Sequence, residues 1–169
     1  MDAGLVIRVP ESEALVSRWR AEHDASARDG MPAHVTLLFP FKPLEMTTAH
    51  DLSKLADLFA AQAPFTLRFG EIGRFPDTLW LKPEPDAPCK ALTRAIEQAF
   101  PDYPIYGGTF DDVIPHLTVA QGPSDVLDGA ERALRAAFKP IRSDVTAVTL
   151  FAKTGRWTAQ HEFALGQKR

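Results

Sequence analysis

Two short segments of the sequence carry the same pair of polar residues at the same spacing. Histidine and threonine alternate with apolar residues at His34 and Thr36, and again at His116 and Thr118. A proline lies one or two residues before each histidine, and each segment has the alternation of a β-strand. Because alternate side chains of a strand lie on one face, we expect each histidine to share a face with its threonine.

These residue types suit chemistry at a phosphodiester. Displacement at phosphorus needs a base for the attacking oxygen and an acid for the leaving oxygen. Two imidazoles can fill these roles near pH 7, because one can be neutral while the other is protonated. Threonine hydroxyls can donate hydrogen bonds to the non-bridging oxygens. We therefore expect His34 and His116 to be catalytic and Thr36 and Thr118 to bind phosphate, an arrangement that requires no metal and no cofactor.

Further residues near these strands are candidates for substrate contacts. The aromatic side chains that could stack on a nucleobase are Phe41, Tyr106 and Phe110. The cations that could approach a phosphate are Arg8, Lys153 and Arg156. The alternatives are that the rings only pack a loop and that the cations are solvated surface charges.

Other interpretations of the two histidines are structural or metal-binding. Both could be hydrogen-bonded histidines at strand ends, with the threonines present only as residues that favour strands. Both could also ligate a metal, with Asp111 or Asp112 nearby in the sequence as a third ligand. The single cysteine, Cys89, is expected to be a small buried residue rather than a nucleophile.

The strands and helices that must position these residues alternate along the chain. Apolar periodicity predicts strands at 4–9, 34–39, 65–72, 78–82, 116–120, 144–151 and 160–165, and helices at 12–23, 48–61, 88–100 and 124–138. Residues 24–32, 101–115 and 152–157 are predicted to be connections. Residues 4–72 and 78–165 thus form near-repeats whose second strand carries a histidine, which favours one two-lobed α+β domain over residues 1–169.

The repeated motifs lie within longer stretches that resemble the two-histidine phosphoesterases, a family that includes bacterial 2'-5' RNA ligase and cyclic phosphodiesterase proteins. These stretches are MPAHVTLLFPF, RFP, YGGTFDDVIPHLTVAQG and GRW, at 31–41, 74–76, 106–122 and 155–157. The resemblance implies two pseudo-symmetric lobes, each an antiparallel sheet flanked by helices, with a central cleft. It also implies metal-independent opening of 2',3'-cyclic phosphates, or cleavage and joining of 2'-5' phosphodiester bonds, in RNA or nucleotides.

Composition limits the partners. The 169 residues carry a net charge of -3, whereas a protein that coats duplex DNA needs a basic surplus. A small nucleotide or an RNA end is therefore the expected substrate. With 45% hydrophobic residues, we expect a monomer with a hydrophobic core. Because the sequence shows no apolar run of membrane-spanning length and no targeting segment, we expect it to be cytoplasmic. The alternative function is a non-catalytic module of the same fold that binds a nucleotide or an RNA end.

Overall fold

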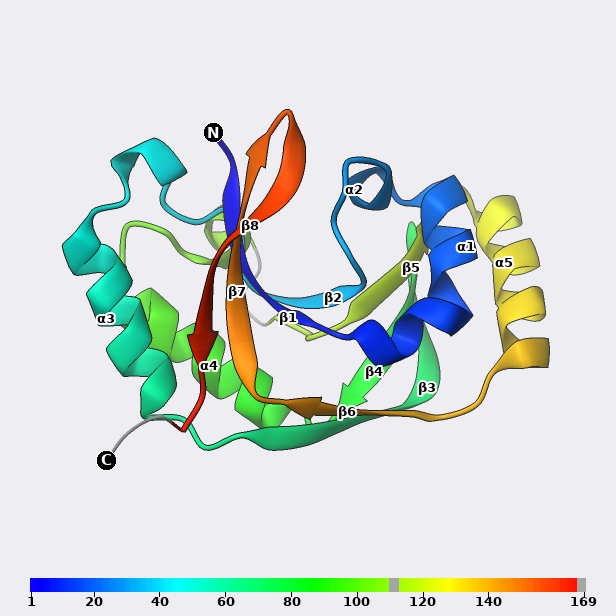
Figure 1. Ribbon diagram of the computed structural model, residues 1–169. Coiled ribbons are helices and arrows are strands. Elements are labelled where there is room, and N and C mark those ends of the chain that lie inside the picture. Colours follow the sequence, from blue (N-terminus) through cyan, green and yellow to red (C-terminus); the bar gives the residue numbers. More distant parts are fainter. Residues whose placement is uncertain (110–112, 167–169) are drawn as a thin grey trace.

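A single curved antiparallel sheet organises the protein. The computed structural model describes residues 1–109 and 113–166. Within these residues the sheet has eight strands in the order β6-β3-β4-β5-β2-β1-β7-β8 (Figure 1). The strands are β1 (Ala3–Arg8), β2 (His34–Leu38), β3 (Phe65–Phe75), β4 (Thr78–Glu84), β5 (Leu117–Gln121), β6 (Ile141–Val145), β7 (Ala147–Thr154) and β8 (Arg156–Ala164). The antiparallel α+β class predicted from the sequence is confirmed.

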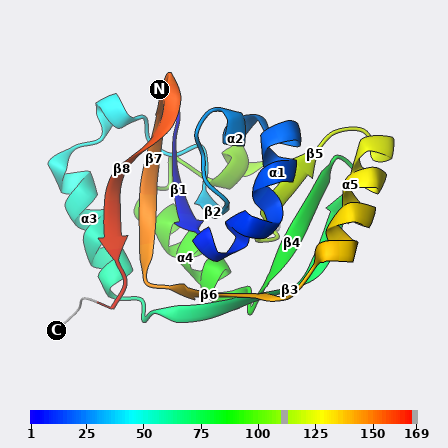
Figure 2. The ribbon, with the colours of Figure 1, turned by 45° about the vertical axis from the view of Figure 1, so that its right-hand side comes forward.

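Helices cover the two ends of this sheet. They are α1 (Glu13–His23), α2 (Ala25–Arg28), α3 (Ala49–Ala60), α4 (Ala87–Ala99) and α5 (Ser124–Ala137), with short 3-10 turns at Pro10–Ser12, Leu44–Met46 and Ile105–Gly108. The helices α3 and α4 pack together against β8 and β2, whereas α1 and α5 pack together against β4 and β5 (Figures 1 and 2). The sheet therefore has two related halves that meet where β2 pairs with β5.

Each half of the sheet takes strands from both of the near-repeats predicted at 4–72 and 78–165. The third strand of the first repeat, β3, pairs with β4 of the second repeat. In return β7, from the second repeat, pairs with β1 of the first. A tight hairpin joins β3 to β4, and hairpins place consecutive strands side by side. Residues 4–72 and 78–165 consequently interlock, and each contributes to both halves of the sheet.

The helix beneath the first histidine strand is fixed by a buried polar contact. In α4, Leu92 and Ile96 are buried in the core as the helical spacing predicts. Between them, the Thr93 hydroxyl donates a 2.6 Å hydrogen bond to the backbone carbonyl of Leu37 in β2. This bond holds α4 against the strand that carries His34.

The alternation along β2 and β5 separates core from solvent as predicted. Val35, Leu37, Leu117 and Val119 are all fully buried, on the face where the helices pack. The histidines and threonines between them are half-buried on the opposite face. The apolar residues thus support the sheet from behind while the polar residues remain open to a ligand.

Several predicted boundaries differ from the structure. The connection predicted at 152–157 is only a turn at Gly155, because β7 extends to Thr154 and β8 begins at Arg156. The strand predicted at 144–151 is broken at Thr146, because β6 pairs with β3 in one half of the sheet and β7 pairs with β1 in the other. The predicted loop at 24–32 contains α2, whose start is capped by the Asp24 carboxylate accepting a hydrogen bond from the Ser26 backbone at 3.0 Å. The break at Thr146 follows from strand pairing outside the local sequence pattern, whereas α2 begins with a local contact between Asp24 and Ser26.

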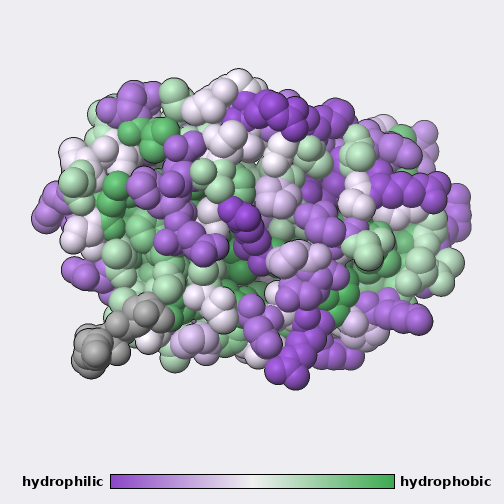
Figure 3. All heavy atoms as spheres, viewed as in Figure 1, coloured by the Kyte–Doolittle hydropathy of each residue, from purple (hydrophilic) through white to green (hydrophobic). Residues whose placement is uncertain are grey.

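The surface in the view of Figure 3 is covered largely by hydrophilic residues, with smaller hydrophobic areas between them. The large hydrophobic side chains exposed among the described residues are Met1, Met46 and Ile114. Within residues 1–109 and 113–166, none of the helices has the length and apolar character needed to cross a bilayer.

Candidate active site

The two histidine motifs lie side by side on adjacent strands. Val35 of β2 pairs with Leu117 of β5 in an antiparallel register. Extending this register by one residue places His34 opposite Thr118, and Thr36 opposite His116, on the face away from the helices. The two histidines are then diagonal neighbours on adjacent strands, for which the expected distance between the two Cα atoms is about 7–8 Å. A tetrahedral phosphate fits between groups at that separation.

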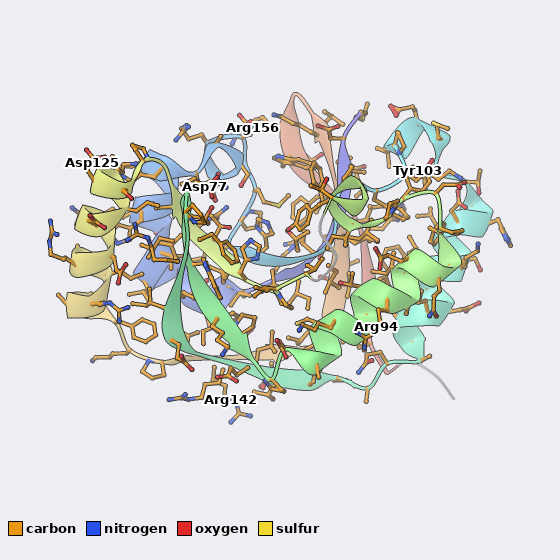
Figure 4. All side chains as sticks on the ribbon, turned by 180° about the vertical axis from the view of Figure 1, so that it is seen from behind. Asp77, Arg94, Tyr103, Asp125, Arg142 and Arg156 are labelled. Atoms are coloured by element: carbon orange, nitrogen blue, oxygen red, sulfur yellow. The ribbon has the colours of Figure 1, made fainter. Side chains whose placement is uncertain are left out.

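All four side chains line one cleft of about 630 Å³. The two hairpins that follow β3 and β7 rise on the same side of the molecule, where Asp77 and Arg156 mark their tips (Figure 4). The cleft wall includes Phe75, Pro76, Asp77 and Thr78 from the β3–β4 hairpin, and Trp157 from the β7–β8 hairpin. Its volume matches that of ordinary small-molecule sites.

Both imidazole rings are held in the same way. The Nδ1 atom of His34 lies 2.8 Å from the carbonyl oxygen of Pro32, and Nδ1 of His116 lies 2.8 Å from that of Ile114. A carbonyl oxygen only accepts, so each Nδ1 must carry the proton and donate. Each neutral ring therefore presents Nε2 with its lone pair as the nitrogen that can serve a ligand.

Burial in the cleft lowers the pKa of both histidines. Desolvation brings the pKa of His34 to about 4, although the hydrogen bond to Pro32 opposes this effect. Desolvation also lowers the pKa of His116, against the hydrogen bond to Ile114. Both rings are consequently neutral at pH 7 in the ligand-free cleft, and an anion bound between them would favour their protonation.

A buried ion pair lies behind His34. Arg20 Nε donates to Asp24 Oδ2 at 3.1 Å, and both side chains are almost completely buried. The Ser26 hydroxyl donates to the second Asp24 oxygen at 2.8 Å. Asp24 and Ser26 also line the cleft. Because breaking a buried pair leaves an uncompensated charge, this group fixes the wall beside His34 firmly.

Tyr106 enters the cleft beside the first threonine, as a candidate substrate contact should. Its hydroxyl is hydrogen-bonded to the side chain of Thr36, and burial raises its pKa. Its backbone occupies the left-handed region (φ 51°) and its amide donates to the carbonyl of Phe39 at 2.6 Å. A non-glycine residue keeps such a backbone only where its surroundings enforce it, so the Tyr106 ring is held in a fixed position.

Aromatic rings flank His116, and a second aromatic pair lines the cleft. On one side Phe75 stacks on Trp80 with ring centroids 4.8 Å apart, and Phe75 meets the edge of His116 at 5.2 Å. Elsewhere in the cleft lining Phe39 and Trp157 make an edge-to-face pair with ring centroids 6.0 Å apart. The cleft is thus apolar near its walls and polar at its floor.

Phe41 is not a cleft residue, which corrects the prediction made for it. The ring is only 2% exposed and packs edge-on against Phe100, with centroids 5.1 Å apart. Its backbone amide donates to the Ala3 carbonyl at 2.8 Å, which directs the side chain into the core. Phe110 lies outside the described residues, as do Asp111 and Asp112.

The three candidate cations surround the cleft without lining it. Arg8 is exposed next to His34 in the β1–β2 register, and its guanidinium lies 5.0 Å from the Phe151 ring. Lys153 pairs with Asp29 at 2.8 Å. Arg156 donates to the carbonyl of Arg28 at 3.3 Å. The last two contacts tie the β7–β8 hairpin to the segment around α2, so their role in the structure is to shape the rim.

Several lining residues were not predicted from the sequence. Those with polar or aromatic side chains are Asp24, Ser26, Phe39, Phe75, Asp77, Thr78, Gln121 and Trp157. Four of them fall in the stretches at 31–41, 74–76, 106–122 and 155–157, which were a usable signal: Phe39, Phe75, Gln121 and Trp157. Asp24, Ser26, Asp77 and Thr78 reach the cleft through tertiary contacts. Over the described ranges, no three histidine, cysteine, aspartate or glutamate side chains converge as metal ligands.

Comparison with known proteins agrees with this architecture. The family model of the 2'-5' RNA ligase superfamily matches residues 9–157. A Bacillus pumilus (strain SAFR-032) protein named as a phosphoesterase is 29% identical over 146 residues, which is 82% of each chain.

Solved structures share the fold. The protein TT0787 of Thermus thermophilus is 20% identical over the full length of both chains, with a TM-score of 0.64. Escherichia coli LigT complexed with 3'-AMP is 23% identical over 98% of both chains, with a TM-score of 0.61. LigT was also solved with NADP+, with a TM-score of 0.59. The region matched by the family model includes both histidine strands, and this chain belongs to the 2'-5' RNA ligase superfamily.

Proposed function

We propose that this protein is a phosphodiesterase that opens 2',3'-cyclic phosphates, or cleaves and joins 2'-5' phosphodiester bonds, through His34 and His116. The observation that carries the proposal is the pair of imidazoles on adjacent strands of one cleft, each fixed by a backbone carbonyl at Nδ1. The complexes of LigT with 3'-AMP and with ATP support a nucleotide as the ligand class.

In hydrolysis, one imidazole accepts a proton from water at Nε2 while the water oxygen attacks phosphorus. The bond from phosphorus to one ribose oxygen breaks on the opposite side. The other imidazole, protonated at Nε2, donates its proton to that oxygen, and the product is a nucleoside monophosphate. The hydroxyls of Thr36 and Thr118 donate to the non-bridging oxygens and stabilise the charge that develops there.

The same pair can run the joining reaction. A ribose 5'-hydroxyl then replaces water as the nucleophile and loses its proton to the base. The 3'-oxygen of the cyclic phosphate leaves with a proton from the acid, so that a 2'-5' bond remains. Both directions use the same residues in exchanged roles. No step in this scheme is assigned to a metal ion.

Turnover of 2',3'-cyclic nucleotides by the purified protein tests the proposal. His34→Ala and His116→Ala should each lower kcat by roughly 100-fold or more, because each removes one proton transfer. The double variant should lose far less than the product of the single losses, since the pair acts as a unit. Thr36→Ala and Thr118→Ala should each cost less than a histidine substitution.

The matched control is His50→Ala, at an exposed histidine in α3 that does not line the cleft. It should retain wild-type turnover. Wild-type rates from the double variant would refute the assignment of the two histidines. Nucleotide binding without turnover of any diester would instead establish a binding module of the same fold.

A further inference from the structure

The cleft wall next to His116 is a regular array of side chains from three strands. Phe75 of β3 pairs with Thr78 of β4, which pairs with Gln121 of β5. In the neighbouring row, Trp80 pairs with Thr118. Directly paired residues present their side chains on the same face of a sheet. The row of Phe75, Thr78 and Gln121 therefore lies about 7 Å, two residues along a strand, from the phosphate-binding Thr118.

Gln121 reaches the cleft because β5 contains an irregularity. Leu79 pairs with Ala120 and Trp80 pairs with Thr118, so Val119 is an extra residue in β5. Strict alternation from His116 and Thr118 would put Ala120 in the cleft, but Ala120 is fully buried and Gln121 lines the cleft instead. A bulge that redirects a side chain in this way is typical of functional positions.

Asp77 is fastened beside Gln121. Its backbone carbonyl accepts a 3.1 Å hydrogen bond from Gly122, the residue after Gln121. One oxygen of its carboxylate accepts a 3.0 Å hydrogen bond from the Thr78 hydroxyl. These bonds hold the tip of the β3–β4 hairpin against the end of β5, and Asp77 marks that tip in Figure 4. This part of the cleft wall thus presents the Asp77 carboxylate and the Gln121 amide next to the Phe75 ring.

The charge of the cleft near Asp77 favours a neutral ligand group that carries hydrogen-bond donors. Among the lining residues that the structure describes, the ionisable acids are Asp24 and Asp77, and neither lysine nor arginine is present. Asp24 is already paired with Arg20. The carboxylate of Asp77 is therefore the local charge at the hairpin tip, where it would repel a second phosphate and attract hydrogen-bond donors.

Guanine matches this donor and acceptor set best. A carboxylate only accepts, with several lone pairs on two oxygens, whereas a glutamine amide both donates and accepts. The Watson–Crick edge of guanine carries two adjacent donors, N1–H and the N2 amino group, for the carboxylate, and the acceptor O6 for the amide. Adenine and cytosine offer one amino group beside an acceptor nitrogen. Uracil flanks its single donor with two carbonyls, which a carboxylate repels.

We propose that Phe75, Asp77 and Gln121 form a nucleobase subsite that selects guanine, with the base against Phe75 and its edge on the two polar side chains. This inference rests on the proposed function, because the base must belong to the nucleotide whose phosphate lies between the two histidines. The cleft then takes a guanosine 2',3'-cyclic phosphate, or an RNA end with a terminal guanosine, in preference to uridine.

Comparison of kcat/KM for the 2',3'-cyclic phosphates of guanosine, adenosine, cytidine and uridine tests the subsite. A well-formed bidentate contact is worth about 1–3 kcal/mol, so guanosine should exceed uridine by roughly 10- to 100-fold. Asp77→Asn replaces one acceptor with a donor and should reduce that ratio by about 10-fold. Asp125→Asn, at an exposed aspartate of α5 outside the cleft, is the matched control and should keep the wild-type ratio.

Equal rates for the four nucleotides, or an unchanged ratio in Asp77→Asn, would overturn the subsite while leaving the proposed reaction intact. Absence of turnover with all four would count against the proposed reaction instead. In that case, titration calorimetry with 3'-GMP and 3'-UMP makes the same comparison by binding alone. Tighter binding of 3'-GMP that Asp77→Asn abolishes would support the subsite, and equal affinities would overturn it.

Discussion

Acid should destabilise the ligand-free protein through its active-site histidines, and His34→Asn should remove much of this effect. The pKa of His34 is about 4 in the folded protein, because the ring is desolvated, against 6.5 for the ordinary group. Above pH 6.5 the ring is neutral in both the folded and unfolded states. As the pH falls from 6.5 to 4, the unfolded chain binds a proton that the folded protein does not bind, so the free energy of unfolding decreases.

The size of the effect follows from the two pKa values. At pH 5 the protonation factors of the unfolded and folded states differ by about 30-fold, which corresponds to roughly 2 kcal/mol. His116, whose pKa is also lowered by burial, adds a loss of the same sign. Asparagine retains a donor near the position of Nδ1 and can keep the hydrogen bond to the Pro32 carbonyl. It has no proton to gain in this range, so its contribution does not change with pH.

Urea unfolding at pH 7.5 and pH 5.0 measures the difference. The wild-type protein should lose about 2 kcal/mol more than His34→Asn over this interval, because the contribution of His116 is common to both. His50→Asn, at an exposed position in α3, is the matched control and should show the wild-type loss. An identical loss in His34→Asn and the wild type would refute the claim that His34 is held neutral by burial.

Three further outcomes are expected. The bell-shaped pH profile of kcat/KM should be centred below pH 6.5, because burial lowers the pKa values of both histidines in the free protein, and the profile of kcat should be centred higher because bound phosphate favours protonation. Excess chelator should change neither profile, and a rate that vanishes with chelator would indicate a metal-bound hydroxide. Gly73→Val should lower kcat/KM at least about 10-fold, because the added β-carbon would collide with the Trp80 indole, whose ring centroid lies 6.0 Å from that of His116. An unchanged kcat/KM would show that the positions of the Trp80 and His116 rings are not coupled. Thr93→Val should cost about 1–3 kcal/mol in urea unfolding by removing the 2.6 Å bond to Leu37, whereas a neutral result would show that this bond does not hold α4.

The histidine strands could be predicted because their signals are local. Proline before each segment and the alternation of apolar and polar residues fix both the strand and its two faces, and β2 begins at His34 as expected. The four predicted helices, which correspond to α1, α3, α4 and α5, were located within a few residues for the same reason. At α3, for example, Thr48 and Asp51 form the reciprocal capping contacts that define a helix start.

Residues that depend on pairing between distant segments could not be predicted. Phe41 follows a motif strand in the sequence, yet it is buried against Phe100 from the end of α4, a contact that local pattern does not specify. Gln121 enters the cleft through a bulge whose existence depends on the register with β4. In each case the deciding interaction joins parts of the chain that single-sequence periodicity treats separately.

The interlocked repeats have a consequence for how the protein comes apart. Since β3 completes the sheet half built on β4 and β5, and β7 completes the half built on β1 and β2, neither half can detach while the other persists. Opening of the catalytic junction between β2 and β5 should thus require global rather than local unfolding, and both halves should melt in one cooperative step. A chain severed between Pro76 and Asp77 would yield two fragments, each with one of the two cleft histidines, that rebuild the cleft only by complementing each other.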